Sequence, residues 1–280
     1  PLSPQLRRCA DGATEIGLMG HNEMTVPASY IKIANRLADI AGPIVARYFR
    51  SGIAIADKSD ASPVTAADRE AEAAIWAVLE AECPDHGILG EEYGGHNLDA
   101  EYVWVPDPID GTKAFVTGKP LFGTLIALCQ NGSSILGVID QPILKERWVG
   151  AAGHATTYNG EAISTRDCAD IKDAWLYATS PDMFRGADEV AFNRLAEHVK
   201  FPLFGCDCYA YGLLASGFTD IVCEATMKPY DYCALVPIVE GAGGIMSDWR
   251  GAPLTMTSDG RVLASGDAKL HESAINLLAG

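Results

Sequence analysis

The sequence has no hydrophobic run long enough to cross a membrane. The longest apolar stretch, Leu121 to Cys129, covers nine of the 280 residues and is interrupted by Gly123 and Thr124. A membrane-spanning helix needs about 20 apolar residues. Residues 1–28 lack a signal-peptide core, and their acidic residues argue against an intact transit peptide. We therefore expect no membrane partner, and we interpret residues 1–28 as an N-terminal tail or a processed remnant.

Positive charge is scarce. Lys and Arg total 21 against 37 Asp and Glu, which gives a net charge of -16. Such a chain repels a polyanion and gains little from counterion release, so we expect no nucleic-acid partner. The excess of carboxylates suits divalent metals or a cationic ligand, although solubility is an equally good explanation. The positions of the acids must decide between these explanations.

Paired cysteine motifs are also missing. The eight cysteines include no C-x-x-C pair, so neither a zinc site nor a thioredoxin-like motif is indicated. Several cysteines lie in apolar runs, as Cys129 does, which is typical of small buried thiols kept reduced inside a cell. We expect no disulfides and an intracellular, reducing location.

Hydrophobic periodicity predicts two helices near the start of the chain. Apolar residues at three- and four-residue spacings predict a helix that begins at Ser29 as its cap and is kinked at Pro43. A second helix is predicted from Ala66 to Ala81, opened by Thr65 with Asp68 three residues later. Asp68 therefore has a purely structural explanation as a capping residue.

Short apolar runs bounded by Gly, Pro and Asn-Gly predict strands from residue 88 onward. The predicted strands cover 88–90, 102–105, 121–129, 135–139 and 148–149, with a hairpin turn at Asn131-Gly132. The second half alternates between a strand at 175–179, helices at 187–199 and 209–216, a strand at 220–223 and a helix at 231–242. Such alternation implies helices layered on a sheet. The expected fold class is α/β (α+β), antiparallel-rich over 29–150 and α/β over 151–280, with no flexible linker near residue 150.

The densest functional signal is the segment from Trp104 to Thr112. A predicted strand ends there in two carboxylates, Asp107 and Asp110, followed by Gly111. Mg²⁺ takes oxygen ligands, so two such carboxylates with a free carbonyl between them can hold neighbouring ions. Gly111 and Thr112 can present backbone N–H groups to a phosphate if a helix starts there. The alternative is that the two carboxylates only cap a turn.

Two further acidic segments lie at the ends of predicted elements. Glu91 and Glu92 follow the strand at 88–90, and Asp231 stands at the start of the helix at 231–242. The structural alternatives are solvated loop charges for the two glutamates and an N-cap for Asp231. Acids at three termini, one of them followed by a Gly-Thr turn, are the pattern expected of a multi-metal phosphoryl-transfer centre.

These segments resemble the inositol monophosphatase family of Mg²⁺-dependent, lithium-sensitive phosphatases. The resemblance rests on Gly90-Glu91-Glu92, Asp107-Pro108-Ile109-Asp110-Gly111-Thr112, Tyr230-Asp231 with Glu240-Gly241-Ala242-Gly243-Gly244 following, and Lys58 to Asp68. It covers nearly all of residues 29–280. It implies a layered αβαβα sandwich of the inositol monophosphatase and fructose-bisphosphatase type, with 29–280 as a single catalytic domain, and it suggests a homodimer.

The resemblance also implies a metal centre. Its ligands are Glu91, Asp107, the Ile109 carbonyl, Asp110 and Asp231, and Asp107 bridges two ions. Two or three Mg²⁺ ions are implied in each active site, and lithium is expected to inhibit. Hard oxygen ligation of this kind is consistent with the residue types.

A metal-activated water is the implied nucleophile, since a cation lowers the pKa of its water. Thr112 orients that water, with Asp68 accepting a hydrogen bond from the Thr112 hydroxyl and Glu91 assisting. Gly111 and Thr112 are the implied phosphate-binding residues.

Within the family, Thr179 to Phe184 and Gly205 to Tyr211 resemble histidinol-phosphate phosphatases, as does Tyr230-Asp231 where inositol phosphatases carry Trp-Asp. Histidinol carries an ammonium and an imidazole, so its pocket should present acids. Asp207 and Glu224 are the candidate substrate-binding residues, although Asp207 could equally be a helix cap. The predicted activity is hydrolysis of L-histidinol phosphate to L-histidinol and phosphate in histidine biosynthesis. It would take place in the cytoplasm, or in the plastid stroma if the source is a plant or alga.

Two other functions stay open. One is a phosphatase of the same fold acting on inositol phosphate, 3′-phosphoadenosine phosphate or fructose bisphosphate, which should bring additional bases to the pocket. After Ser180 the nearby bases are Arg185, Arg194, Lys200 and Lys228. The other is a non-catalytic metal-binding or regulatory scaffold. Thr112 and Asp68 beside a full set of acids argue against it, because a protein without turnover has no need to position a water.

Overall fold

The structure is a computed structural model that describes residues 25–52, 55–57 and 63–280. Residues 1–24, which make up most of the predicted tail, lie outside the described residues, and so do residues 58–62 of the Lys58 to Asp68 motif. The side chain of Thr65 is not described either, so its predicted capping role is untested.

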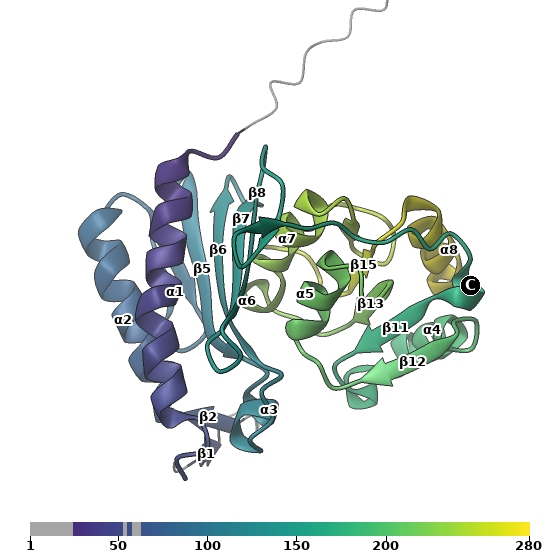
Figure 1. The fold of residues 1–280 in the computed structure, drawn as a ribbon, viewed down its shortest axis with the longest axis horizontal. Coiled ribbons are helices and arrows are strands. Elements are labelled where there is room, and N and C mark those ends of the chain that lie inside the picture. Colours follow the sequence, from purple (N-terminus) through teal and green to yellow (C-terminus); the bar gives the residue numbers. More distant parts are fainter. Residues whose placement is uncertain (1–24, 53–54, 58–62) are drawn as a thin grey trace, which may run out of the picture.

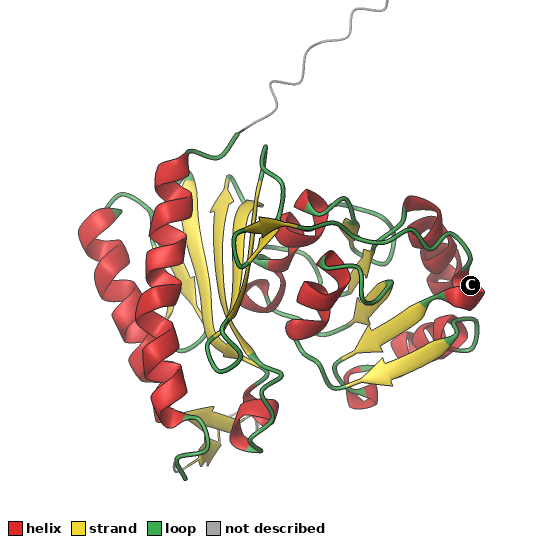
Figure 2. Ribbon diagram, viewed as in Figure 1, coloured by secondary structure: helices red, strands yellow, loops and turns green. Residues whose placement is uncertain are grey.

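Helices and sheets form five layers (Figures 1 and 2). In order across the molecule, these are α1 (Ala28–Tyr48) with α2 (Ala66–Glu82), an eight-stranded sheet, α5 (Tyr209–Ala215) with α6 (Pro229–Tyr232) and α7 (Leu235–Gly241), a five-stranded sheet, and α4 (Ala187–Ala196) with α8 (Ala268–Ala279). This arrangement confirms the layered αβαβα sandwich. Among the described residues, no helix combines the length and apolar character needed to cross a membrane.

The first sheet has the strand order β10-β9-β8-β7-β6-β5-β3-β4. Its strands are β3 (Gly87–Gly90), β4 (Gly94–His96), β5 (Tyr102–Asp110), β6 (Gly123–Gln130), β7 (Ser133–Gln141), β8 (Glu146–Ala151), β9 (Thr157–Tyr158) and β10 (Glu161–Ala162). The β3–β5 pair is parallel and the other pairs are antiparallel. The strands predicted in this half are confirmed, as is the hairpin at Asn131-Gly132. The sheet extends to Ala162, whereas the sequence analysis divided the chain near residue 150.

The second sheet has the order β12-β11-β13-β15-β14 and mixes parallel and antiparallel pairs. Its strands are β11 (Trp175–Ala178), β12 (Phe201–Phe204), β13 (Ile221–Glu224), β14 (Ile245–Ser247) and β15 (Val262–Ser265). The remaining elements are β1 (Ile55–Asp57), β2 (Pro63–Thr65), α3 (Thr112–Val116) and 3₁₀ turns at Ile171–Asp173 and Pro181–Met183. The helix predicted over 187–199 ends at Ala196, before the unpredicted strand β12.

The predicted start of the first helix is wrong. Ser29 lies inside α1, whose N-cap is Pro27. The backbone N–H of Val26 donates to the carbonyl of Ala152 at 3.0 Å, and this tertiary contact fixes the chain just before the helix. Pro43 lies within α1 as predicted, and the helix continues beyond it to Tyr48.

The single helix predicted over 231–242 is also wrong, because the structure has two helices there, α6 and α7. Pro237 has no N–H to donate to the carbonyl four residues earlier, at Cys233. A continuous helix would lose that hydrogen bond. The chain instead restarts as α7, where Pro237 occupies the first turn and its missing N–H costs nothing.

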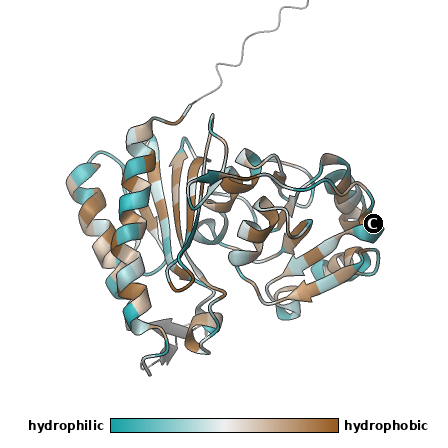
Figure 3. Ribbon diagram, in the orientation of Figure 1, coloured by the Kyte–Doolittle hydropathy of each residue, from teal (hydrophilic) through white to brown (hydrophobic). Residues whose placement is uncertain are grey.

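Hydrophobic residues concentrate in the strands of the first sheet and alternate with hydrophilic ones along α1 (Figure 3). One core cluster packs α1 and α2 against the first sheet, and another packs the second sheet against α4 and α8. The central cluster joins residues of both sheets to α5–α7. The two halves of the chain therefore share one core.

Two glycines bring the central helical layer onto the first sheet. Gly137 of β7 and Gly150 of β8 are cross-strand partners. A methyl group added at Gly137 would lie 1.8 Å from the carbonyl oxygen of Ala234, and one at Gly150 would lie 2.3 Å from that of Pro237. The segment from Ala234 to Pro237 thus rests on the strand backbones with no side chain between them. This contact sets the height of Asp231, which precedes the segment, above the sheet.

Candidate active site

A bulge at the end of β5 turns Asp107 and Asp110 toward the same side of the first sheet. Asp107 lies opposite Leu125 of β6, whereas Asp110 lies opposite Gly123, so three steps along β5 match two along β6. Residues three apart in a regular strand point to opposite faces. The extra residue of the bulge restores a common face. Both carboxylates therefore face the central helical layer, while Ile109 packs into the core beneath α1 and α2.

Asp231 completes a cluster of three carboxylates. It lies in the first turn of α6, and one oxygen from each of Asp107, Asp110 and Asp231 lies within 4.8 Å of the others. Glu91 and Asp68 lie close enough to act on the charge of Asp107. The structure therefore brings together the five acids that the sequence analysis selected.

Burial and mutual repulsion raise the pKa values of the three clustered carboxyl groups, Asp107, Asp110 and Asp231. The pKa of Asp107 lies well above its ordinary value, first because of desolvation and then because of the charges of Glu91, Asp110, Asp231 and Asp68. Desolvation likewise raises the pKa of Asp231 to about 7. Crowded, desolvated carboxylates need either protons or a cation to offset their charge. The donor set, all oxygen, fits a hard divalent cation.

Each carboxylate of the cluster is held by one backbone N–H group. Asp107 accepts from the N–H of Ile109 at 3.0 Å, Asp110 from Cys208 at 2.7 Å, and Asp231 from Lys228 at 2.7 Å. The turn-capping alternative thus holds for Asp107. The N-cap alternative for Asp231 is wrong in position, because Lys228 is the N-cap of α6 and Asp231, at the third helical position, accepts from the Lys228 backbone N–H. These bonds fix the orientation of the side chains before any ligand binds.

Glu72, which was not identified from the sequence, supports the loop that carries Glu91. The buried Glu72 carboxylate accepts from the backbone N–H groups of Glu92 at 2.9 Å and Tyr93 at 3.0 Å. Glu72 lies one helical turn after Asp68 on the buried face of α2. An acid on the apolar stripe of a helix was the available signal. Glu92 itself forms an ion pair with Arg69 at 3.5 Å.

Gly111 and Thr112 form the turn between β5 and α3. Gly111 has a φ of 87°, in the left-handed region that favours glycine. The Thr112 hydroxyl donates to the Ile109 carbonyl at 3.1 Å. A hydroxyl has a single proton, so the predicted donation from Thr112 to Asp68 requires a change of partner and stays a prediction.

Asp207 lies directly over this turn. A methyl group at Gly111 would lie 3.0 Å from the Asp207 Cβ and Cγ atoms. The N-cap of α5 is Cys208, which makes no side-chain capping bond, and the Asp207 carboxylate accepts no hydrogen bond from the described residues. The helix-cap alternative for Asp207 is therefore contradicted. Burial raises the pKa of Asp207 to about 6, against the opposing effect of Lys119 and Lys113.

Glu224, at the end of β13, accepts three hydrogen bonds. Its Oε1 accepts from the Thr179 N–H at 2.9 Å and from the Thr179 hydroxyl, and its Oε2 accepts from the Tyr211 hydroxyl at 3.2 Å. Desolvation raises its pKa to about 7, with a contribution from Asp207. The two predicted substrate-binding acids are thus near neighbours.

Lys113 and Lys119 were not identified as pocket residues from the sequence. Both act on the charge of Asp207 from α3 and the loop after it. The bases considered from the sequence all lie after Ser180, whereas these two follow the Gly111-Thr112 turn. Their position beside the phosphate-binding motif was the signal that could have identified them.

Comparison with known proteins is consistent with this geometry. Residues 27–279 match the sequence model of the inositol monophosphatase family. An Arabidopsis thaliana protein named bifunctional phosphatase IMPL2, chloroplastic, is 50% identical over 258 residues, which cover 89% of this chain and 75% of the relative. A histidinol-phosphatase of Chlorobaculum parvum is 34% identical over 237 residues, covering 84% of this chain and 92% of the relative. A solved structure of an inositol monophosphatase from Zymomonas mobilis shares 49% identity and a TM-score of 0.84, covering 90% of this chain and 98% of that one. The chain therefore belongs to the inositol monophosphatase family.

Proposed function

We propose that this protein is a Mg²⁺-dependent phosphomonoesterase that hydrolyses L-histidinol phosphate to L-histidinol and phosphate. Membership of a phosphatase family supports the reaction class. A relative named histidinol-phosphatase supports the substrate. The observation that carries the proposal is Asp207, a carboxylate with no capping role that lies directly over the Gly111-Thr112 turn.

In this proposal, Glu91, Asp107, the Ile109 carbonyl, Asp110 and Asp231 hold two or three Mg²⁺ ions. The cations would activate a water molecule and neutralise the phosphate oxygens.

The remaining chemistry belongs to side chains and backbone. Gly111 and Thr112 bind the phosphate through their N–H groups at the start of α3. The Thr112 hydroxyl orients the attacking water, with Asp68 as its hydrogen-bond acceptor and Glu91 assisting.

Asp207 and Glu224 provide the specificity. A buried ammonium or imidazolium must be paired with acceptors or it loses several kcal/mol of hydration. Glu224 is fixed by Thr179 and Tyr211, so its carboxylate is held in one orientation. Asp207 is not fixed by a hydrogen bond from the described residues, so its carboxylate is available to a cationic substrate.

The experiment that tests this proposal is phosphate release from histidinol phosphate, inositol 1-phosphate and 3′-phosphoadenosine phosphate, with and without Mg²⁺. We expect Mg²⁺-dependent release that is fastest from histidinol phosphate, and inhibition by lithium. A preference for inositol 1-phosphate would support the second candidate function instead. The 49% identical solved structure of an inositol monophosphatase favours that candidate.

Replacing Asp207 by alanine is expected to raise KM for histidinol phosphate by about tenfold or more. A hydrogen bond to a charged group contributes about 1.5–3 kcal/mol, and each 1.4 kcal/mol is a factor of ten. The KM for inositol 1-phosphate should change much less, because that substrate has no cationic end. Asp167→Ala, which removes an exposed carboxylate elsewhere, is the matched control. Equal effects on both substrates would remove the basis for the histidinol assignment.

Protons are expected to compete with the metal. The pKa of Asp231 in the metal-free folded protein is about 7, above its value in an unfolded chain, so the folded protein takes up a proton as the pH falls through 7. The metal-free protein gains stability from this proton, whereas a cation must displace it. The increase in Tm caused by millimolar Mg²⁺ should therefore be larger at pH 8 than at pH 6. An equal increase at both pH values would contradict the proposed ligands.

The homodimer stays a proposal, and sedimentation of the purified chain measures the oligomeric state.

The cellular location also stays a proposal. The plant relative is named as chloroplastic, which supports a plastid location if the source is a plant or alga. The seven cysteines in the described part of the chain carry free thiols, and Cys9 lies outside it.

A further inference from the structure

A cavity of ≈ 720 Å³ lies between α1 and strands β7–β9. It is on the α1 side of the first sheet, whereas the carboxylate cluster faces the opposite side. Its volume is within the range of about 300–1,000 Å³ that is typical of small-molecule sites. Apolar residues such as Ile31, Ala46 and Val149 form much of its wall. Nothing in the proposed function uses this space.

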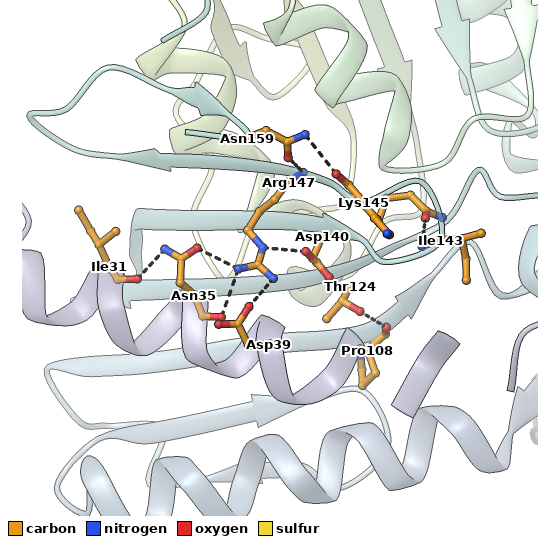
Figure 4. Close-up of polar contacts among 11 residues, drawn as sticks. Ile31, Asn35, Asp39, Pro108, Thr124, Asp140, Ile143, Lys145, Arg147 and Asn159 are labelled. Carbon is orange, nitrogen blue, oxygen red and sulfur yellow. Dashed lines mark hydrogen bonds and ion pairs between the residues drawn. The ribbon is translucent and has the colours of Figure 1, made fainter. Parts of the chain in front are cut away.

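Arg147 forms one side of the cavity, and its charge is already neutralised (Figure 4). Its guanidinium group bonds Asp140 at 2.7 Å through Nε, Asp39 at 2.8 Å through Nη2, and the Asn35 side chain at 3.2 Å through Nη1. Asp140 is 6% exposed. Arg147 therefore orders the wall and is not available as a receptor for an anion.

Three charged groups at the cavity can bond a ligand, and of these Asp39 and Lys145 are exposed whereas Asp140 is buried. The second carboxylate oxygens of Asp39 and Asp140 accept no hydrogen bond from the described residues. The Lys145 ammonium makes no ion pair or hydrogen bond among them either, although the Lys145 carbonyl accepts from Asn159 at 3.1 Å. In Figure 4, Lys145 lies on the far side of Asp140 from Asp39. The cavity thus presents acceptors toward one end and a cation toward the other.

We propose that this cavity binds a small zwitterion with an apolar body, of the class of an aliphatic amino acid. Asp39 and Asp140 receive the ammonium group, and Lys145 receives the carboxylate. The apolar wall takes the side chain. A phosphate dianion would be repelled by the two carboxylates, and a simple amine would leave Lys145 unused.

A row of polar residues connects this cavity to the bulge of β5. Arg147 of β8 is the cross-strand partner of Asp140 of β7, and Asp140 is the partner of Thr124 of β6. The buried Thr124 hydroxyl donates to the Pro108 carbonyl at 2.8 Å, within the bulge that orients Asp107 (Figure 4). We expect zwitterion binding to be linked to cation binding through this row. The linkage rests on the proposed function, whereas the zwitterion site does not.

Calorimetry on the metal-free full chain tests the site, with L-leucine as the probe. Isopentylamine lacks the carboxylate and N-acetyl-L-leucine lacks the ammonium, so each should bind about tenfold more weakly or worse. Lys145→Gln should weaken the binding of L-leucine by a similar factor and leave the affinity for isopentylamine unchanged. Lys32→Gln on the exposed side of α1 is the matched control. The proposal is overturned if L-leucine shows no saturable binding up to about 10 mM, which is ten times a Kd of about 1 mM. It is also overturned if the three probes bind with equal affinity.

Titration with Mg²⁺ in the presence and absence of saturating L-leucine tests the linkage. We expect the Mg²⁺ affinity to change by about fivefold or more, as coupled sites usually show. Thr124→Val should abolish that change while L-leucine still binds. An unchanged Mg²⁺ affinity would disprove the linkage. Failure of Mg²⁺ to bind at all would contradict the proposed metal centre, while the metal-free titration still decides the zwitterion site.

Discussion

Replacing Asp107 by asparagine is expected to reduce the rate of phosphate release by about 10³-fold or more while the protein stays folded. Cations at a phosphoryl-transfer site stabilise several kcal/mol of developing charge, and about 4 kcal/mol corresponds to 10³ in rate. Asp107 is the member of the cluster on which four other acids act. Asparagine keeps the oxygen that accepts from Ile109, so the turn survives.

The same substitution should stabilise the metal-free protein, because it removes a desolvated charge from among like charges. Thermal unfolding without metal should therefore show a higher Tm, and the increase caused by Mg²⁺ should disappear. Asp99→Asn removes an exposed charge near the other end of β5 and should change neither quantity. A near-normal rate for Asp107→Asn at saturating Mg²⁺ would show that the assignment is wrong.

Replacing Thr112 by alanine is expected to lower kcat by about 10²–10⁴-fold, the range for loss of a proton-transfer partner. Metal affinity should change little, because the hydroxyl is not among the proposed ligands. The hydroxyl donates to the Ile109 carbonyl in the structure. With the Ile109 carbonyl occupied by a cation, the hydroxyl would donate its hydrogen bond to Asp68 instead, and its oxygen would orient the water.

Thr112→Ser retains the hydroxyl and should retain most of the rate. Asp68→Asn should lower kcat by an amount similar to Thr112→Ala, and the double variant should lose little more, because the two residues act as a unit. If the free-energy losses of the two single variants add up in the double variant, Thr112 and Asp68 act independently. Trapping of a phosphorylated residue during turnover would exclude direct attack by water.

Most of the fold can be predicted from the sequence where an element depends on local patterns. The strands from Tyr102 to Ala151 agree because apolar runs bounded by turn residues are clear there, and the helix α2 agrees because Thr65 and Asp68 mark its start. The start of α1 and the break between α6 and α7 differ because they depend on a tertiary contact of Val26 and on the position of Pro237. Strands β12, β14 and β15 are short and were not predicted.

The candidate site was predictable in its residue types but not in its geometry. Carboxylates three apart on a strand should diverge, and only the bulge between Asp107 and Asp110 brings them together. The pairing that defines this bulge, three residues of β5 against two of β6, forms only in the folded sheet. Glu72 and the lysines beside Asp207 carried signals in the sequence, but their contacts with the Glu91 loop and with Asp207 form only in the folded chain.

The contact of Gly137 and Gly150 with the segment before and within α7 has a consequence for sequence variation. Each added carbon there would push Asp231 away from Asp107, although neither glycine touches a ligand. In a library of single substitutions selected for phosphatase activity, both positions should tolerate replacement as poorly as the carboxylates themselves. Loss-of-function variants would then arise in the middle of two ordinary strands, where a search confined to charged residues would never look.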